Sequence, residues 1–69
     1  MNSELLKRIA VDAKIRSGKP CIKGTRIAVE DVLGYLAGGM TKEQILDDFP
    51  DLKEEDISAV LEYSASPSA

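Results

Sequence analysis

The chain has 69 residues, one cysteine and no histidine, so it has room for one small domain and no intrachain disulfide. Zinc is held in proteins mainly by histidine and cysteine, so we expect no metal, and no motif predicts a cofactor. The formal net charge of −3 is unevenly divided: residues 1–29 carry seven basic and two acidic side chains, a net charge of +5, whereas residues 30–69 carry two basic and ten acidic side chains, a net charge of −8. The basic half suits a polyanion, and the acidic half suits a basic protein.

The N-terminal residues 1–28 are predicted to form a basic β-ribbon arm. Residues 8–11 and 26–29 have the same sequence, Arg-Ile-Ala-Val, whose alternation is typical of a short strand. Residues 20–22 are a third extended candidate. Helical character in this arm is limited to one turn around residues 5–6. We expect a hairpin or a three-stranded ribbon.

The stretch of glycine and lysine at residues 17–26 raises the question of a nucleotide-binding loop. A P-loop needs a glycine, four further residues and then Gly-Lys-Ser/Thr, between a strand and a helix. Here Gly-Lys comes first and Lys-Gly-Thr second, and Pro20 between them removes a backbone donor. A P-loop is therefore excluded, and we interpret the stretch as a hairpin scaffold in which Gly24 permits the tight turn.

The same arm carries clustered cations, which are the physical signature of contact with a phosphate backbone. No aromatic residue is interleaved among them, so stacking on single-stranded bases is not predicted. The simpler interpretation is that these side chains are solvated. The candidate nucleic-acid contacts are Arg8, Arg16, Lys19, Lys23 and Arg26.

Residues 29–64 are predicted to form three helices in a helix-turn-helix-like unit of winged-helix or homeodomain-like type. In the first helix, apolar residues recur at helical spacing and form one stripe. This stripe consists of Val29, Val32, Leu33 and Leu36. The paired glycines at 38–39 are expected to end the helix in a left-handed C-cap.

The second helix is predicted to begin at Thr41, which forms a capping box with Gln44, and to stop before Pro50. The third begins around Lys53, and its predicted apolar stripe consists of Ile57, Val60 and Leu61. The fold expected for residues 1–64 is thus a single, mainly α domain with a short β-hairpin in front, and residues 65–69 are predicted to be a disordered tail.

Catalytic chemistry is not predicted. General acid–base and nucleophilic catalysis need convergent groups with tuned pKa values, and the chain offers no histidine to serve in them. Cys21 lies between Pro20 and Ile22 in a predicted strand, so we interpret it as an inert buried thiol. The first residues lack the apolar segment of a secretory signal, and no apolar run approaches the length of a membrane helix. We therefore expect a cytoplasmic protein without membrane contact.

Two blocks of the sequence resemble a known family. The first runs from Gly-Lys-Pro at residues 18–20 through Ile-Lys-Gly-Thr-Arg-Ile at 22–27, and the second includes Gly-Met-Thr at 39–41 and Glu-Asp-Ile at 55–57. Residues 8–61 resemble the family known as domain of unknown function 433, small bacterial proteins proposed as antitoxins. The resemblance implies a β-ribbon followed by a helix-turn-helix-like unit, and a small basic toxin of PIN-like nuclease fold as partner. Lys53 departs from the family, which commonly has Ser or Thr at that N-cap.

Two functions remain open. In the first, an acidic helical face binds and neutralises the nuclease, and the candidate contacts are Asp47, Asp48 and Asp51. These carboxylates lie near a helix C-terminus, where the helix dipole disfavours them, although they also fit a merely solvated turn. In the second, the protein is a DNA-binding autoregulator that uses the basic ribbon as a homodimer, with or without exchange of the N-terminal strand. The three carboxylates at residues 54–56 disfavour the usual docking of the last helix in the major groove.

Overall fold

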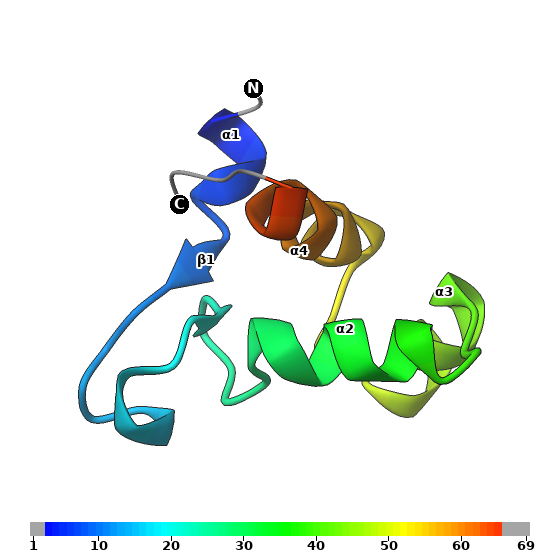
Figure 1. The fold of residues 1–69 in the computed structure, drawn as a ribbon, viewed down its shortest axis with the longest axis horizontal. Helices are drawn as coiled ribbons and strands as arrows, with labels where there is room; N and C mark the ends of the chain where they lie inside the picture. Colours follow the sequence, from blue (N-terminus) through cyan, green and yellow to red (C-terminus); the bar gives the residue numbers. More distant parts are fainter. Residues whose placement is uncertain (1–2, 66–69) are drawn as a thin grey trace.

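The computed structural model describes residues 3–65, which form a mostly helical domain with a short antiparallel hairpin near the N-terminus (Figure 1). This confirms the predicted fold class. The helices are α1 (Ser3–Leu6), α2 (Val29–Ala37), α3 (Lys42–Asp48) and α4 (Glu54–Ala65), the strands are β1 (Ile9–Ala10) and β2 (Cys21–Ile22), and a 3-10 turn, η1, covers Arg16–Gly18.

Of the two predicted forms of the arm, the hairpin and the three-stranded ribbon, the structure has the hairpin. β1 and β2 pair antiparallel with Ile9 opposite Ile22 and Ala10 opposite Cys21. The predicted third strand at residues 26–29 is reduced to one isolated bridge between Cys21 and Ala28. It cannot continue because α2 begins at the next residue, where the Val29 N–H donates to the Pro20 carbonyl at 2.8 Å.

The ends of α2 and α3 follow local sequence signals. Gly39, just after α2, has a φ of 100°, the left-handed conformation that glycine adopts without steric cost. The Thr41 hydroxyl accepts from the Gln44 N–H at 3.1 Å, and the Gln44 side chain accepts from the Thr41 N–H at 2.8 Å. The predicted capping box is therefore confirmed, and it fixes the start of α3.

α4 shows how the Lys53 N-cap works without an acceptor of its own. The Lys53 N–H donates to the Asp56 carboxylate at 2.9 Å, which is the half of a capping box that needs no side chain at the N-cap.

The helix continues to Ala65, one residue into the predicted tail; residues 66–69 lie outside the described residues. The predicted stripe is wrong at Leu61, which is 42% exposed. Leu61 lies about 100° further round the helix than the buried Val60.

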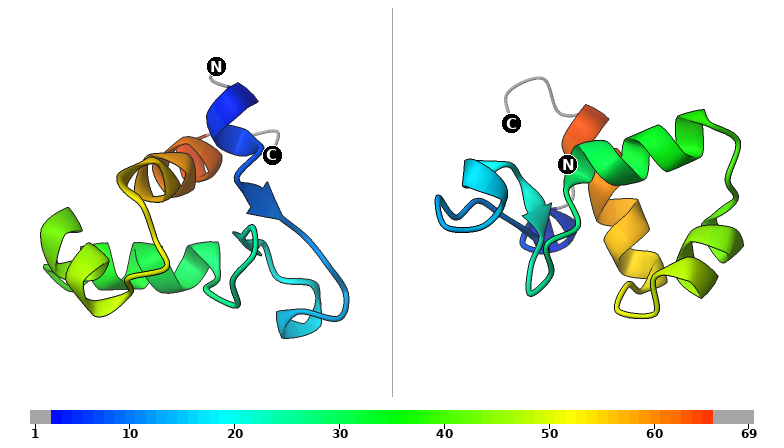
Figure 2. Two further views of the ribbon diagram at one scale, coloured as in Figure 1. Left: turned by 180° about the vertical axis from the view of Figure 1, so that it is seen from behind. Right: turned by 90° about the horizontal axis from the view of Figure 1, so that it is seen from below.

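The core gathers residues from the hairpin, from the three longer helices and from the turn between α3 and α4. Its buried members are Ile22, Val29, Val32, Ile45, Leu52, Ile57 and Val60. The Tyr35 and Phe49 rings stack beside it, with centroids 5.2 Å apart. α1 packs against α4, so the first and last described elements lie side by side (Figures 1 and 2). The arm is thus part of the same domain as the helices.

Candidate functional site

Arg8 is the first of the predicted nucleic-acid contacts, and the structure places it against the helical unit. Its guanidinium donates to the Asp56 carboxylate at 2.9 Å. The Asp56 side chain is 7% exposed and also accepts the Lys53 N–H. A carboxylate this buried needs a charged partner or several hydrogen bonds, and here it has both. The ion pair therefore joins the arm to the start of α4.

Arg16 makes the equivalent contact at the start of α2. Its guanidinium donates at 2.8 Å to both the Asp31 carboxylate and the Arg26 carbonyl. Asp31 also accepts the Ala28 N–H at 3.2 Å, so it has the same capping position in α2 that Asp56 has in α4. The Arg16 hydrogen bond, together with that of the Ala28 N–H, lowers the pKa of Asp31 below its ordinary value. Asp31 likewise raises the pKa of the Arg16 guanidinium.

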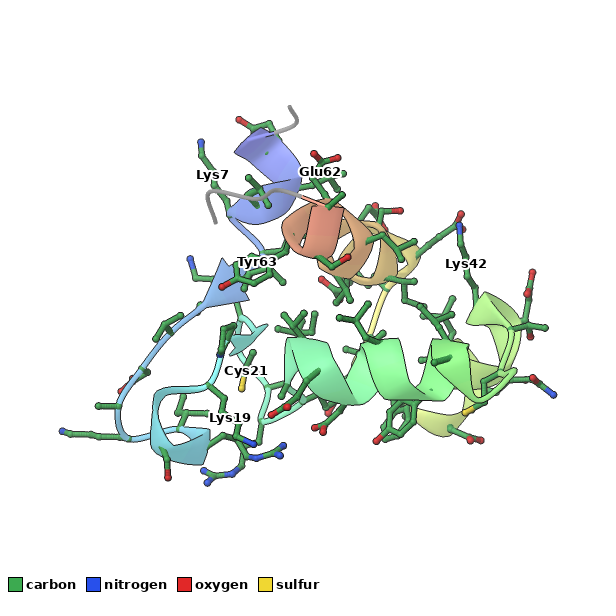
Figure 3. All side chains as sticks on the ribbon, viewed as in Figure 1. Lys7, Lys19, Cys21, Lys42, Glu62 and Tyr63 are labelled. Atoms are coloured by element: carbon green, nitrogen blue, oxygen red, sulfur yellow. The ribbon has the colours of Figure 1, made fainter. Side chains whose placement is uncertain are left out.

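Lys19 forms a third ion pair, with Glu30 in the first turn of α2, and both side chains are about half exposed. Figure 3 shows Lys19 on the segment of the arm that faces α2. Three of the five predicted nucleic-acid contacts are therefore used within the molecule. The remaining two, Lys23 and Arg26, are exposed, and their side chains make no hydrogen bond or ion pair with any residue in the described part of the chain.

These ion pairs reduce the net charge of both halves of the sequence. With the four ion pairs set aside, including Lys7–Glu4, residues 1–29 keep three basic and one acidic side chain, a net charge of +2. Residues 30–69 keep two basic and seven acidic side chains, a net charge of −5. Three of the seven basic side chains of residues 1–29 therefore neutralise carboxylates in the first turns of α2 and α4, and the larger part of the charge that remains is acidic.

Asp47, Asp48 and Asp51 are all exposed, and we call them the acidic corner. The first two end α3 and the third follows Pro50 in the turn to α4. None of the three has a hydrogen bond or ion pair from its side chain within residues 3–65. Figure 1 places the end of α3 and this turn at the opposite side of the molecule from η1. Within the described part of the chain, no cation forms an ion pair with these three carboxylates.

The start of α4 is also acidic, but less than its sequence indicates. Glu54 and Glu55 are exposed, whereas Asp56 points inward to Arg8 and the Lys53 N–H. Sequence reasoning missed the partners Asp31 and Asp56. Their position three residues after the N-cap was a usable signal for capping, but nothing in the local sequence indicated which arginine would reach them.

Cys21 is 3% exposed on β2, as predicted for a buried thiol (Figure 3). Among residues 3–65 no group of three or more His, Cys, Asp or Glu side chains is arranged to hold a metal ion. In the same span no helix is both long enough and apolar enough to cross a membrane. Two surface features therefore remain as candidate binding sites: the acidic corner, and the basic hairpin turn that carries Lys23 and Arg26.

Comparison with known proteins gives a family and a fold. The family model described as "Protein of unknown function (DUF433)" matches residues 9–64. A crystal structure of a DUF433 member protein from Anabaena variabilis ATCC 29413 is similar, with a TM-score of 0.84 and 27% sequence identity. The similarity covers 96% of this chain and 65% of that chain, so the present sequence spans less than two thirds of its structural relative. No curated protein matches the chain. Since the family model covers most of the sequence, the chain belongs to the DUF433 family of proteins of unknown function.

Proposed function

We propose that the protein is an antitoxin-type adaptor whose acidic corner binds and neutralises a small basic nuclease of PIN-like fold. The observation that carries the proposal is the uncompensated charge. Outside its ion pairs the helical part keeps a net charge of −5, and the acidic corner forms no ion pair with any cation of residues 3–65. A basic partner supplies that missing charge.

The mechanism needs no chemistry from the adaptor. A nuclease binds RNA through a basic surface, and an acidic protein that covers this surface excludes the substrate. Complementary charge raises the association rate, since oppositely charged patches steer the encounter. Asp47 and Asp48 are suited to this task, because they lie at the C-terminal end of α3 where the helix dipole adds negative potential.

The DNA-binding alternative has fewer groups to work with than the sequence indicates. Arg8, Arg16 and Lys19 are engaged with carboxylates, which leaves Lys23 and Arg26 among the candidate contacts. Exposed Glu54 and Glu55 at the start of α4 oppose insertion of that helix into the major groove. As a homodimeric autoregulator the protein would therefore contact phosphates through its hairpin turns alone.

The test is inhibition of RNA cleavage by a purified small basic nuclease of PIN-like fold from the same organism. Wild-type protein is expected to abolish cleavage at stoichiometric amounts and to form a stable complex in gel filtration. The variant D47N/D48N/D51N should inhibit much more weakly at the same concentration. Its melting temperature should not fall, because the three exposed side chains make no hydrogen bond or ion pair within residues 3–65, and two of them lie at the end of α3 that the helix dipole makes unfavourable for carboxylates. Full inhibition by this variant, or no complex with wild type, would exclude the acidic corner as the inhibitory surface.

A further inference from the structure

The hairpin turn between Ile22 and Ile27 is held by two backbone hydrogen bonds and by two more that involve the Thr25 hydroxyl. The Ile22 N–H donates to the Ile27 carbonyl at 2.9 Å, and the Thr25 N–H donates to the Ile22 carbonyl at 3.0 Å. The Thr25 hydroxyl accepts the Ile27 N–H and donates to the Ile22 carbonyl. Gly24 has a φ of 82°, as the third position of a type II turn requires. The turn is therefore a rigid scaffold.

This scaffold presents donors and no acid. The Lys23 and Arg26 side chains are exposed and unpaired, and the backbone N–H groups of Gly24 and Arg26 donate to no acceptor among residues 3–65. The Thr25 hydroxyl is already engaged at both its donor and its acceptor side. Two cations and two amide N–H groups thus lie within four consecutive residues.

The acids next in sequence to this turn are neutralised by the arm itself. Asp31 is held by Arg16 and the Ala28 N–H, and Glu30 is paired with Lys19. Arg16 also donates to the Arg26 carbonyl, which places a third cationic side chain at the base of the turn. An anion that approaches Lys23 and Arg26 therefore meets positive potential, although the whole chain is acidic.

We propose that the Lys23–Arg26 turn is a binding site for a phosphate group. Lys23 and Arg26 supply charge-assisted hydrogen bonds, and the amides of Gly24 and Arg26 supply two more donors. No aromatic or apolar side chain lies within these four residues, so the site recognises the phosphate and not the group that carries it. The phosphate belongs either to a nucleic-acid backbone or to a small phosphorylated molecule. The site does not depend on the acidic corner.

The test is an amide NMR titration of the full chain with inorganic phosphate at low ionic strength. Saturable shifts are expected at the Gly24 and Arg26 amides. The variant K23Q/R26Q should bind phosphate about tenfold more weakly, whereas K42Q/K53Q, which loses the same charge from the helical part, should bind as wild type does. Absence of saturable shifts at Gly24 and Arg26, or equal weakening in the two variants, would overturn the proposal.

Two further titrations separate the sources of the phosphate and the two proposals. A short DNA duplex that shifts the same amides at lower concentration, and loses affinity linearly with the logarithm of salt concentration, assigns the site to nucleic acid. Binding of phosphate but not of the duplex assigns it to small phosphorylated molecules.

The acidic-corner variant D47N/D48N/D51N should keep the phosphate shifts in full, so loss of nuclease inhibition and loss of phosphate binding are distinguishable. Loss of the shifts in this variant would contradict a site confined to the turn.

Discussion

Arg8 and Asp56 lie 48 positions apart in sequence, and their side chains form an ion pair of 2.9 Å in which the buried carboxylate also caps α4. Asp56 has two structural roles, because its ion pair holds the arm on the helical unit and its hydrogen bond with the Lys53 N–H caps the start of α4. Arg16 and Asp31 repeat this arrangement at α2. Both ion pairs direct basic side chains of the arm inward.

Replacement of Asp56 by Ala is expected to reduce the free energy of unfolding by about 2–3 kcal/mol, since the change removes an N-terminal cap and leaves a partly buried guanidinium unpaired. D56N should cost less, because its side-chain oxygen can still accept the Lys53 N–H. Urea unfolding measures both. Lys7→Ala is the control, as the Lys7–Glu4 pair is largely exposed and should change stability by under about 1 kcal/mol. Equal effects of D56A and the control would contradict the role given to Asp56.

Asp31 makes stability depend on pH in the acid range. The Arg16 hydrogen bond lowers the pKa of Asp31 in the folded state below its ordinary value of 3.8. The unfolded chain therefore binds the proton more readily than the folded protein. The stabilisation that ionised Asp31 gives to the folded state is thus fully present above pH 3.8 and is lost as the pH falls through the folded pKa. The difference in unfolding free energy between wild type and D31N should shrink as the pH falls from 7 to 3. A difference that is constant or grows would refute this linkage.

Thr41 tests the capping box of α3. Thr41→Ala removes the acceptor for the Gln44 N–H and is expected to lower the unfolding free energy by about 1 kcal/mol. Glu43→Gln is the matched change two residues further along, where the exposed side chain makes no hydrogen bond or ion pair within the described chain. Chemical denaturation of the two variants should show a loss for T41A several times that for E43Q. If E43Q is the more damaging, the helix dipole and not the cap dominates this terminus.

Gly34 and Gly39 should respond in opposite directions to alanine. An added Cβ meets nothing within 4 Å at either position, so packing does not distinguish them. Gly34 lies inside α2, where alanine is favoured by about 0.5–1 kcal/mol. Gly39 has a φ of 100°, and L-residues pay about 1–2 kcal/mol for left-handed backbone. Thermal unfolding should therefore show a higher midpoint for G34A and a lower one for G39A; the same sign for both would contradict the assigned conformations.

Local sequence signals predicted the helices well. The caps at Thr41 and Gly39 depend on contacts within a few residues, so they could be deduced without the fold. Leu61 could not be assigned correctly, because the buried face of α4 is set by which neighbours pack there, and the small Ala59 is buried while Leu61 is not. The alternative of a third strand at residues 26–29 also could not be decided from the local sequence, because α2 begins at Val29 and leaves only one isolated bridge, at Ala28.

The exposure of the acidic corner could be predicted from the sequence, whereas the internal ion pairs of the basic arm could not. Asp47, Asp48 and Asp51 are exposed, as a turn at a helix end indicates. The sequence makes Arg8 and Arg16 candidate nucleic-acid contacts, but their pairing with Asp56 and Asp31 depends on tertiary contacts across 48 and 15 positions. Net charge by half of the sequence therefore overstates the positive surface, since it cannot tell which charges meet inside the molecule.

The most direct test of the proposed antitoxin role is the association rate between this protein and a PIN-like nuclease that it inhibits, measured by stopped-flow mixing at several salt concentrations. Two variants lose the same charge at different places: D47N/D48N at the acidic corner, and D12N/E62Q away from it. Figure 3 shows Glu62 beside α1, at the far end of α4 from that corner. We expect D47N/D48N to slow association and flatten its salt dependence, and D12N/E62Q to leave both close to wild type. Equal slowing by the two variants would show that net charge, and not the acidic corner, directs the encounter.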